Sequence, residues 1–254
     1  MKFSYSRVGT YQQCPYRFKL QYIDELKTIE DFEASNALYI GSMLHKAIET
    51  DVETATQEYY DLFPIITDAH INEAMKIEEL APKVKWLLPK GQHEVPLEDE
   101  EFKGFIDYLT ENEIFDYKYS NNIDRYLESE QLHVYKYFAE KLLGVEIKYL
   151  YYVFVPKVQI RQKKTETIEQ FRSRLRSVLS EQQPKIIAVE YDHSKVEKYL
   201  EAVEEIKHAT EFPKNPTKLC DWCNYKNYCQ KGETYDLIWE NIFNIIINWT
   251  FFVS

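Results

Sequence analysis

Residues 102–120 read FKGFIDYLTENEIFDYKYS and contain the clearest structural pattern in the sequence. Two runs of aromatic and β-branched residues are separated by a short polar turn, and this pattern predicts a β-hairpin. With the turn centred between Glu111 and Asn112, residues whose numbers sum to 223 face each other across the hairpin. Asp107 then lies opposite Asp116.

Two facing carboxylates need a cation between them. Directly opposed side chains of a strand pair have Cβ atoms about 4.5–5.5 Å apart, and like charges at that distance destabilise a sheet. Strand alternation also places Lys118 on the same face as Asp116. This group can hold a hard divalent ion such as Mg²⁺ or Mn²⁺ and orient the attacking water in phosphodiester hydrolysis. The alternative is an ordinary amphipathic hairpin, which Gly104 makes less favourable because it permits close approach of a backbone or ligand.

Four cysteines form a second pattern. Cys14 precedes a proline near the N-terminus, and the other three lie within ten residues, at Cys220, Cys223 and Cys229. This spacing fits a four-thiolate site that links the two ends of the chain, and residue chemistry alone leaves zinc and an iron-sulfur cluster open. A thioredoxin-like redox pair is disfavoured because Cys220 does not follow a predicted strand. Disulfides need an oxidising compartment, whereas residues 1–7 have no apolar signal core, so we expect a cytoplasmic protein.

Three further polar residues lie on apolar helix faces. A predicted helix over residues 125–142 carries Gln131 and Tyr135 on its core-facing stripe, one turn apart, and buried amide and phenol groups need partners. A second predicted helix starts at Gly41 and carries His45 on one face with Ile48 and Val52. A lone histidine beside an apolar face is more often a packed residue than a ligand.

The whole chain predicts one α/β domain over residues 1–254. A helical N-terminal portion (5–90) contains a helix at 67–87. The core (91–192) contains the hairpin, the helix at 125–142, strands at 148–155 and 185–191, and a helix at 166–180. A helix at 195–209 leads into the cysteine loop, within residues 193–235. The apolar tail, 236–254, holds too many acids and asparagines for a membrane span, and either packs on the body or docks a partner or a second copy of the chain.

The net charge of −11 is unusual for a nucleic-acid-binding protein, because phosphate contacts supply much of the affinity. Basic residues are densest between Lys157 and Arg176. A DNA groove and an ordinary solvated helix face both remain open for that stretch.

Together these motifs carry a family resemblance. They follow one another in the order Ser4-x-Ser6 before Cys14-Pro15, Gly41-x2-Leu44-His45, Glu94, Gly104-x2-Asp107, Asp116-Tyr117-Lys118, Gln131-x3-Tyr135 and Cys220-x2-Cys223-x5-Cys229. In this order they resemble the RecB-like nucleases of the PD-(D/E)XK superfamily. The resemblance is to the iron-sulfur branch, which includes CRISPR-associated and phage RecB-like exonucleases and AddB-type nuclease domains.

The resemblance implies a restriction-endonuclease-like core, a central mixed β-sheet flanked by helices. It implies that a divalent metal is held by His45, Asp107, Asp116 and the carbonyl of Tyr117, and that Lys118 is the catalytic lysine. Gln131 and Tyr135 would position the substrate or the lysine. Glu94 would be an upstream acid, with Glu98 and Glu101 as alternatives. Cys14, Cys220, Cys223 and Cys229 would hold a 4Fe-4S cluster, and Asp116 stands where the family often has glutamate.

Two functions therefore remain. The first is a metal-dependent nuclease acting on single-stranded DNA or duplex ends, in phage DNA metabolism or CRISPR adaptation. A helicase or an adaptation integrase would then be a partner. The second is a non-catalytic module that holds DNA or a helicase. The complete set of acids, lysine and histidine favours the first.

Overall fold

The structure is a computed structural model and describes residues 1–29, 32–234 and 237–238. The chain forms two compact units. The larger comprises Met1–Lys2 and Phe32–Tyr199, and the smaller comprises Phe3–Asp31 and the chain from Leu200 onward. Among the described residues, none of the helices has both the length and the apolar character needed to cross a bilayer.

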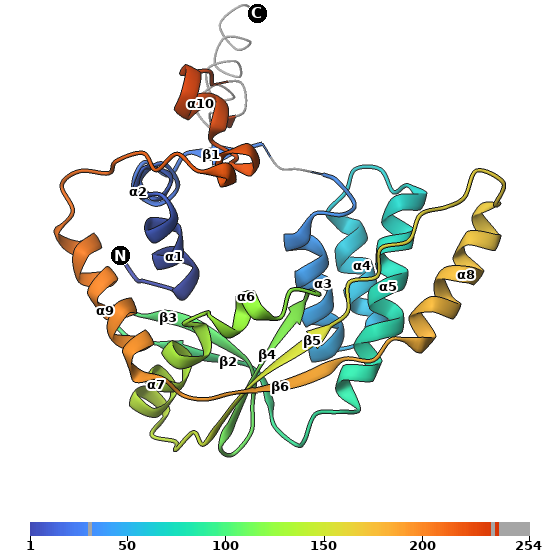
Figure 1. Cartoon of the computed structure of the whole chain (residues 1–254), viewed down its shortest axis with the longest axis horizontal. Coiled ribbons are helices and arrows are strands. Elements are labelled where there is room, and N and C mark those ends of the chain that lie inside the picture. Colours follow the sequence, from blue (N-terminus) through green and yellow to red (C-terminus); the bar gives the residue numbers. More distant parts are fainter. Residues whose placement is uncertain (30–31, 235–236, 239–254) are drawn as a thin grey trace, which may run out of the picture. The chain divides into compact units, whose positions relative to one another are not determined.

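A mixed five-stranded sheet forms the centre of the larger unit (Figure 1). Its strands lie side by side in chain order: β2 (Gln92–Glu98), β3 (Lys103–Leu109), β4 (Glu113–Tyr119), β5 (Tyr149–Val155) and β6 (Lys185–Val189). The β4–β5 pair is parallel and the other three pairs are antiparallel. Helices lie against this sheet, so the predicted α/β fold with a central mixed sheet is confirmed.

The hairpin has the predicted register. Tyr108 pairs with Phe115 and Leu109 with Ile114, so the facing numbers sum to 223. Beyond these two pairs, a side chain continues the contact between β3 and β4. The Asp107 carboxylate Oδ2 accepts a hydrogen bond from the backbone amide of Tyr117 at 2.7 Å. The backbone of β4 therefore holds the Asp107 carboxylate directly.

Alternation along β4 separates the core from the site. Phe115 and Tyr117 pack into the apolar core with residues of α3 (Ala37–Glu49) and α5 (Asp68–Lys85). Lys118, the residue after Tyr117, instead donates a hydrogen bond to Gln131 of α7 (Gln131–Leu143). The period of two in a strand thus places acid and lysine on the face opposite the aromatic residues.

The predicted helices mostly form where expected. Besides α5, these are α8 (Ile168–Glu181) and α9 (His193–His208); α4 (Val52–Asp61) comes between α3 and α5 in the sequence. The predicted start at Gly41 is wrong, because the Asn36 side chain caps the Leu38 amide and α3 begins at Ala37. Val52 does not continue that helix, because Asp51 caps a new one by accepting from the Thr54 amide.

The single helix predicted over 125–142 is also wrong. A short helix, α6 (Asp124–Leu127), ends before α7 begins at Gln131. The Ser129 hydroxyl accepts the Gln131 amide, an alternative partner that competes with helical hydrogen bonding. Strand β2 had not been predicted, since Pro96 interrupts its pattern, and such a proline is tolerated at the edge of a sheet.

The smaller unit combines both ends of the chain. Its N-terminal part contains α1 (Tyr5–Gln13), α2 (Pro15–Phe18), a π-helical turn (Lys19–Ile23) and β1 (Lys27–Thr28). Its C-terminal part contains η2 (Lys218–Trp222), α10 (Lys226–Lys231) and β7 (Leu237–Ile238). The Tyr16 amide donates to the Pro213 carbonyl at 3.1 Å, and the Asn215 amide group donates to the Gln13 carbonyl at 2.9 Å. Apart from residues 237–238, the apolar tail lies outside the described residues.

Candidate active site

A group of polar side chains from α3, β2, β3, β4 and α7 meets in the larger unit. His45 comes from α3, Glu94 from β2, and Asp107 from β3. His45 Nδ1 lies 3.5 Å from Asp107 Oδ1 and 3.8 Å from Glu94 Oε1, while its Nε2 lies 3.3 Å from the Tyr117 carbonyl oxygen. Ligand atoms of the three side chains lie within 4.8 Å of one another. One imidazole nitrogen and the carboxylate oxygens of Glu94 and Asp107 therefore lie close enough together to bind one divalent ion.

Asp116 lies outside this group of three but within electrostatic reach of Asp107, and its carboxylate tests whether a metal fits. Its carboxylate is buried, and its Oδ1 has no hydrogen-bond partner among the described residues. The Lys118 ammonium lies 2.6 Å from the other oxygen, Oδ2. An unpartnered buried carboxylate oxygen is costly, and a bound cation removes that cost. The residues present therefore fit Mg²⁺ or Mn²⁺.

The site carries excess negative charge that protons compensate. Burial, followed by the Asp116 charge, raises the pKa of Asp107 to about 7. Burial by itself lowers the pKa of His45, but Asp107 and Glu94 outweigh it and raise that pKa to about 9. Burial likewise lowers the pKa of Lys118, yet Asp116 and Asp107 raise it overall. A divalent cation can replace the protons that the group otherwise holds.

A polar chain leads away from the lysine. Lys118 donates to the Gln131 Oε1 at 3.0 Å, and the Gln131 amide group donates to the Tyr135 hydroxyl at 3.5 Å. A Cβ atom at Gly104 would lie 3.2 Å from the Tyr135 ring and 3.0 Å from the Phe102 ring. Gly104 thus leaves room for the ring of Tyr135, the last residue in this series of hydrogen bonds.

Of the three candidate upstream acids, Glu94 is near His45. The Glu98 carboxylate pairs with Lys2 at 2.7 Å, and Glu101 is exposed. Glu94 has a backbone φ of 49°, in the left-handed region, which costs roughly 1–2 kcal/mol for an L-residue. Such strain is common at functional sites, where it directs a side chain.

The strain at Glu94 is testable with two substitutions. Both Glu94→Ala and Glu94→Gly remove the carboxylate, but glycine adopts positive φ freely, so Glu94→Gly should be about 1 kcal/mol more stable than Glu94→Ala. Urea unfolding in EDTA measures the difference. Val95 lies in the regular part of the same strand, so Val95→Ala should be more stable than Val95→Gly, the reverse of the order at Glu94. Equal stability of the two Glu94 variants would mean that the backbone there is unstrained.

Sequence reasoning missed Tyr126, whose ring lies near the Lys118 ammonium. It comes from α6, which the sequence merged with the following helix. No spacing rule relates a residue on a short helix to a lysine eight positions earlier on a strand, so no local signal was available.

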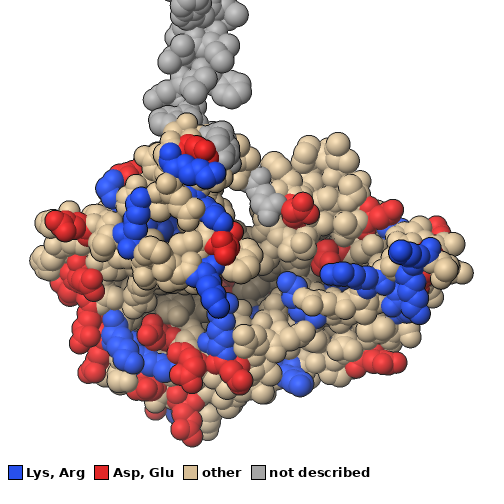
Figure 2. Space-filling model, turned by 45° about the horizontal axis from the view of Figure 1, so that its top comes forward, with Lys and Arg blue, Asp and Glu red and all other residues tan. Residues whose placement is uncertain are grey.

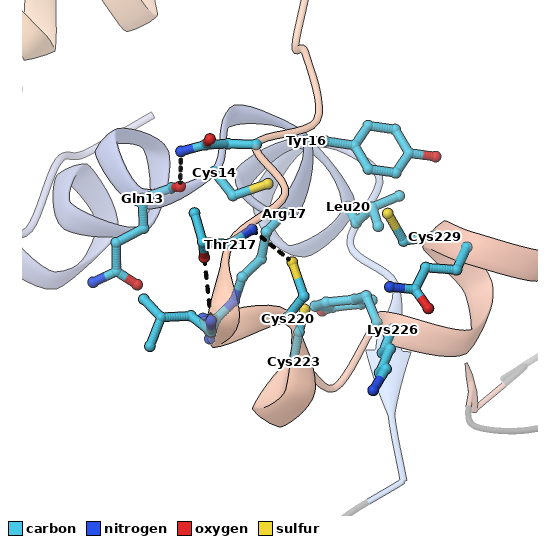
Figure 3. Close-up of a pocket in the computed structure, with 14 residues that line it drawn as sticks. Gln13, Cys14, Tyr16, Arg17, Leu20, Thr217, Cys220, Cys223, Lys226 and Cys229 are labelled. Atoms are coloured by element: carbon cyan, nitrogen blue, oxygen red, sulfur yellow. Dashed lines mark hydrogen bonds between the residues drawn. The ribbon is translucent and has the colours of Figure 1, made fainter.

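In the smaller unit the four cysteines face one pocket (Figure 3). Cys14 precedes α2, while Cys220, Cys223 and Cys229 come from η2 and α10. The pocket encloses about 60 Å³. Burial raises the pKa of the Cys229 thiol, and the other three cysteines add to this effect, because all four lie within electrostatic reach.

Arg17 lines the same pocket. Its Nε is buried and has no hydrogen-bond acceptor among the described residues. Lys226, which also lines the pocket, is paired with Asp221 at 2.7 Å. A buried guanidinium N–H without an acceptor suits a negatively charged group held by the thiolates, so the donor set fits a metal centre.

Comparison with protein families gives a match that spans nearly the whole described chain. Residues 2–230 match the PD-(D/E)XK nuclease superfamily. No curated protein sequence matches the chain. The matched range contains the mixed sheet, the acidic group, Lys118 and all four cysteines. The chain therefore belongs to the PD-(D/E)XK nuclease superfamily, whose members are metal-dependent nucleases.

Proposed function

We propose that this protein is a divalent-metal-dependent deoxyribonuclease that degrades single-stranded DNA or DNA from its ends, and that it carries a 4Fe-4S cluster at its four cysteines. The observation that carries the proposal is the group formed by His45, Glu94 and Asp107, with the buried Asp116 carboxylate and its partner Lys118 near it. By the family resemblance, the setting is phage DNA metabolism or CRISPR adaptation in the cytoplasm, with a helicase or an adaptation integrase as partner.

The residues divide the chemistry between them. His45, Asp107, Asp116 and the Tyr117 carbonyl would hold Mg²⁺ or Mn²⁺, which supplies positive charge to the phosphate and to the attacking water. Lys118 keeps its proton, because the neighbouring carboxylates raise its pKa, and so acts as a hydrogen-bond donor to developing phosphate charge. Gln131 restricts the movement of the ammonium by accepting one of its hydrogens.

The cysteine pocket supports a group larger than one ion. About 60 Å³ exceeds the roughly 10–15 Å³ that a single water occupies by this measure. A 4Fe-4S cluster needs four thiolates, and Cys14, Cys220, Cys223 and Cys229 all line this pocket.

Two arginines of the basic stretch between Lys157 and Arg176 are paired with acids. In the predicted basic stretch, Arg172 pairs with Asp68 at 2.7 Å and Arg174 pairs with Glu166 at 2.8 Å. On the face in Figure 2, Lys and Arg side chains lie among Asp and Glu side chains. For these two arginines the solvated-face interpretation is favoured, so we expect DNA affinity to depend on contacts near the site.

Cleavage assays with the Lys118→Ala variant test the function. We expect the wild-type protein with Mn²⁺ to degrade end-labelled single strands or linear duplex and to spare circular single strands. Lys118→Ala should cleave about 10²–10³-fold more slowly, because it loses a charged donor to the transition state. Mn²⁺ affinity and DNA affinity should change little, because an ammonium is not a metal ligand.

Lys103→Ala is the matched control, since this exposed lysine lies on the neighbouring strand β3 and should leave cleavage unchanged. If wild type and Lys118→Ala bind DNA equally and neither cuts it, the protein is a non-catalytic binding module. Rapid cutting of circular strands would contradict the exonuclease assignment alone.

A further inference from the structure

Two aromatic rings flank the Lys118 ammonium in addition to its polar partners. Its Nζ lies 5.5 Å from the ring centroid of Tyr126 and 5.8 Å from that of Tyr152. The two ring centroids lie 6.0 Å apart. These distances are within the range of cation–π attraction, about 6 Å.

The sheet register builds one of these contacts. Tyr152 on β5 lies opposite Asp116 on β4, and Phe154 lies opposite Lys118. Both aromatic side chains are buried, at 1% and 3% exposure. Tyr126 then packs against this row from α6, with its ring 5.7 Å from that of Phe154. The break between α6 and α7 gives Tyr126 a position independent of Gln131.

We propose that Tyr126 is a positioning residue for Lys118, holding the ammonium by the face of its ring beside the phosphate-binding site. The inference rests on the proposed nuclease function. A lysine side chain has four rotatable bonds, so Asp116 and Gln131 alone leave its head group partly free. Asp116 is itself a predicted metal ligand, and its charge is shared with the ion. A neutral ring attracts the ammonium without adding negative charge that would repel the phosphate.

Tyr126 can be changed without emptying the core, because it is only half-buried, whereas Tyr152 is fully buried. Tyr126→Leu should lower kcat about 3–30-fold, the range that corresponds to one cation–π contact, and leave the KM for DNA nearly unchanged. Tyr126→Phe keeps the ring face and should retain activity. Tyr137→Leu, at a half-buried tyrosine of α7 that packs on Phe138, is the control and should cleave normally.

Fluorinated phenylalanines at position 126 separate electrostatics from packing. Each added fluorine withdraws charge from the ring face with little change in volume, so kcat should fall stepwise. In the Lys118→Ala background, Tyr126→Leu should cause no further loss. A loss of kcat that is equal for Phe and Leu, an absence of any trend with fluorine, or an effect confined to KM would each overturn the proposal; the last outcome would make the ring a contact for DNA.

A readout without activity keeps this test separate from the nuclease assignment. In protein labelled with ¹³C-lysine, the Lys118 Cε resonance should show a ring-current shift that Tyr126→Phe retains and Tyr126→Leu loses. If the wild type does not cut DNA but this shift is present, the proposed function fails and the contact stands. An unchanged Lys118 resonance in Tyr126→Leu overturns the contact itself.

Discussion

Asp107→Asn is expected to abolish metal-dependent cleavage and to make the protein more stable than wild type when no divalent ion is present. Asparagine keeps the side-chain oxygen that accepts the Tyr117 amide, so the hairpin should be preserved. It removes one of the two buried charges that repel each other, and with it a ligand. Wild type should gain stability on addition of Mn²⁺, because a ligand that binds the folded state stabilises it, whereas the variant should gain little.

The pH dependence has a defined sign. The pKa of Asp107 rises from its ordinary 3.8 to about 7 on folding, so the folded state binds more protons between those values. The contribution of Asp107 to the stability of the ion-free protein is therefore fully present below its ordinary pKa and is lost as the pH rises through about 7. His45, raised to about 9, extends the loss to higher pH.

Urea unfolding of wild type and Asp107→Asn at pH 5.5 and 8.5, each with EDTA or Mn²⁺, measures these effects. Only wild type should lose stability strongly between the two pH values in EDTA. Asp61→Asn, an exposed carboxylate of α4, serves as control and should follow wild type in every condition. If Asp107→Asn is folded and keeps full cleavage activity, Asp107 is not a ligand of the catalytic metal.

Cys14→Ala is expected to have the second large effect, loss of the metal centre from a site whose other ligands lie more than 200 residues away. Protein purified without oxygen should be brown and contain about four irons and four sulfides per chain. A site that links Cys14 to Cys220 closes a very long loop, and chain-entropy models assign on the order of 3–5 kcal/mol to such links. The variant should therefore lose its colour and melt at a lower temperature.

Metal analysis, visible absorbance and thermal melting of Cys14→Ala test this. The Asp107→Asn protein is a control, because its substitution lies in the other compact unit and should leave iron content unchanged. A colourless wild type with one zinc per chain would refute the cluster but keep the link between the chain ends. Full metal content in Cys14→Ala would refute the link.

Features set by neighbouring residues could be predicted from the sequence. The polar turn at Glu111 and Asn112 determined the hairpin register, and strand alternation then placed Lys118 beside Asp116. Helical periodicity predicted α5, α8 and α9 to within two residues, whereas it merged α6 and α7 into one helix. These features depend on turn chemistry and on periods of 2 and 3.6 residues, which are local properties of the chain.

Tertiary structure alone decided the rest. The sequence of β2 lacks a clear strand pattern, and the strand forms because it pairs with β3. Within it, Glu94 has a left-handed backbone conformation and its carboxylate lies near His45. The contact of Tyr126 with Lys118, and the position of the buried Arg17 Nε at the cysteine pocket, join residues that no spacing rule connects. Local sequence specifies how each segment folds, whereas the side chains that meet between segments are selected by packing and by the charges that burial forces together.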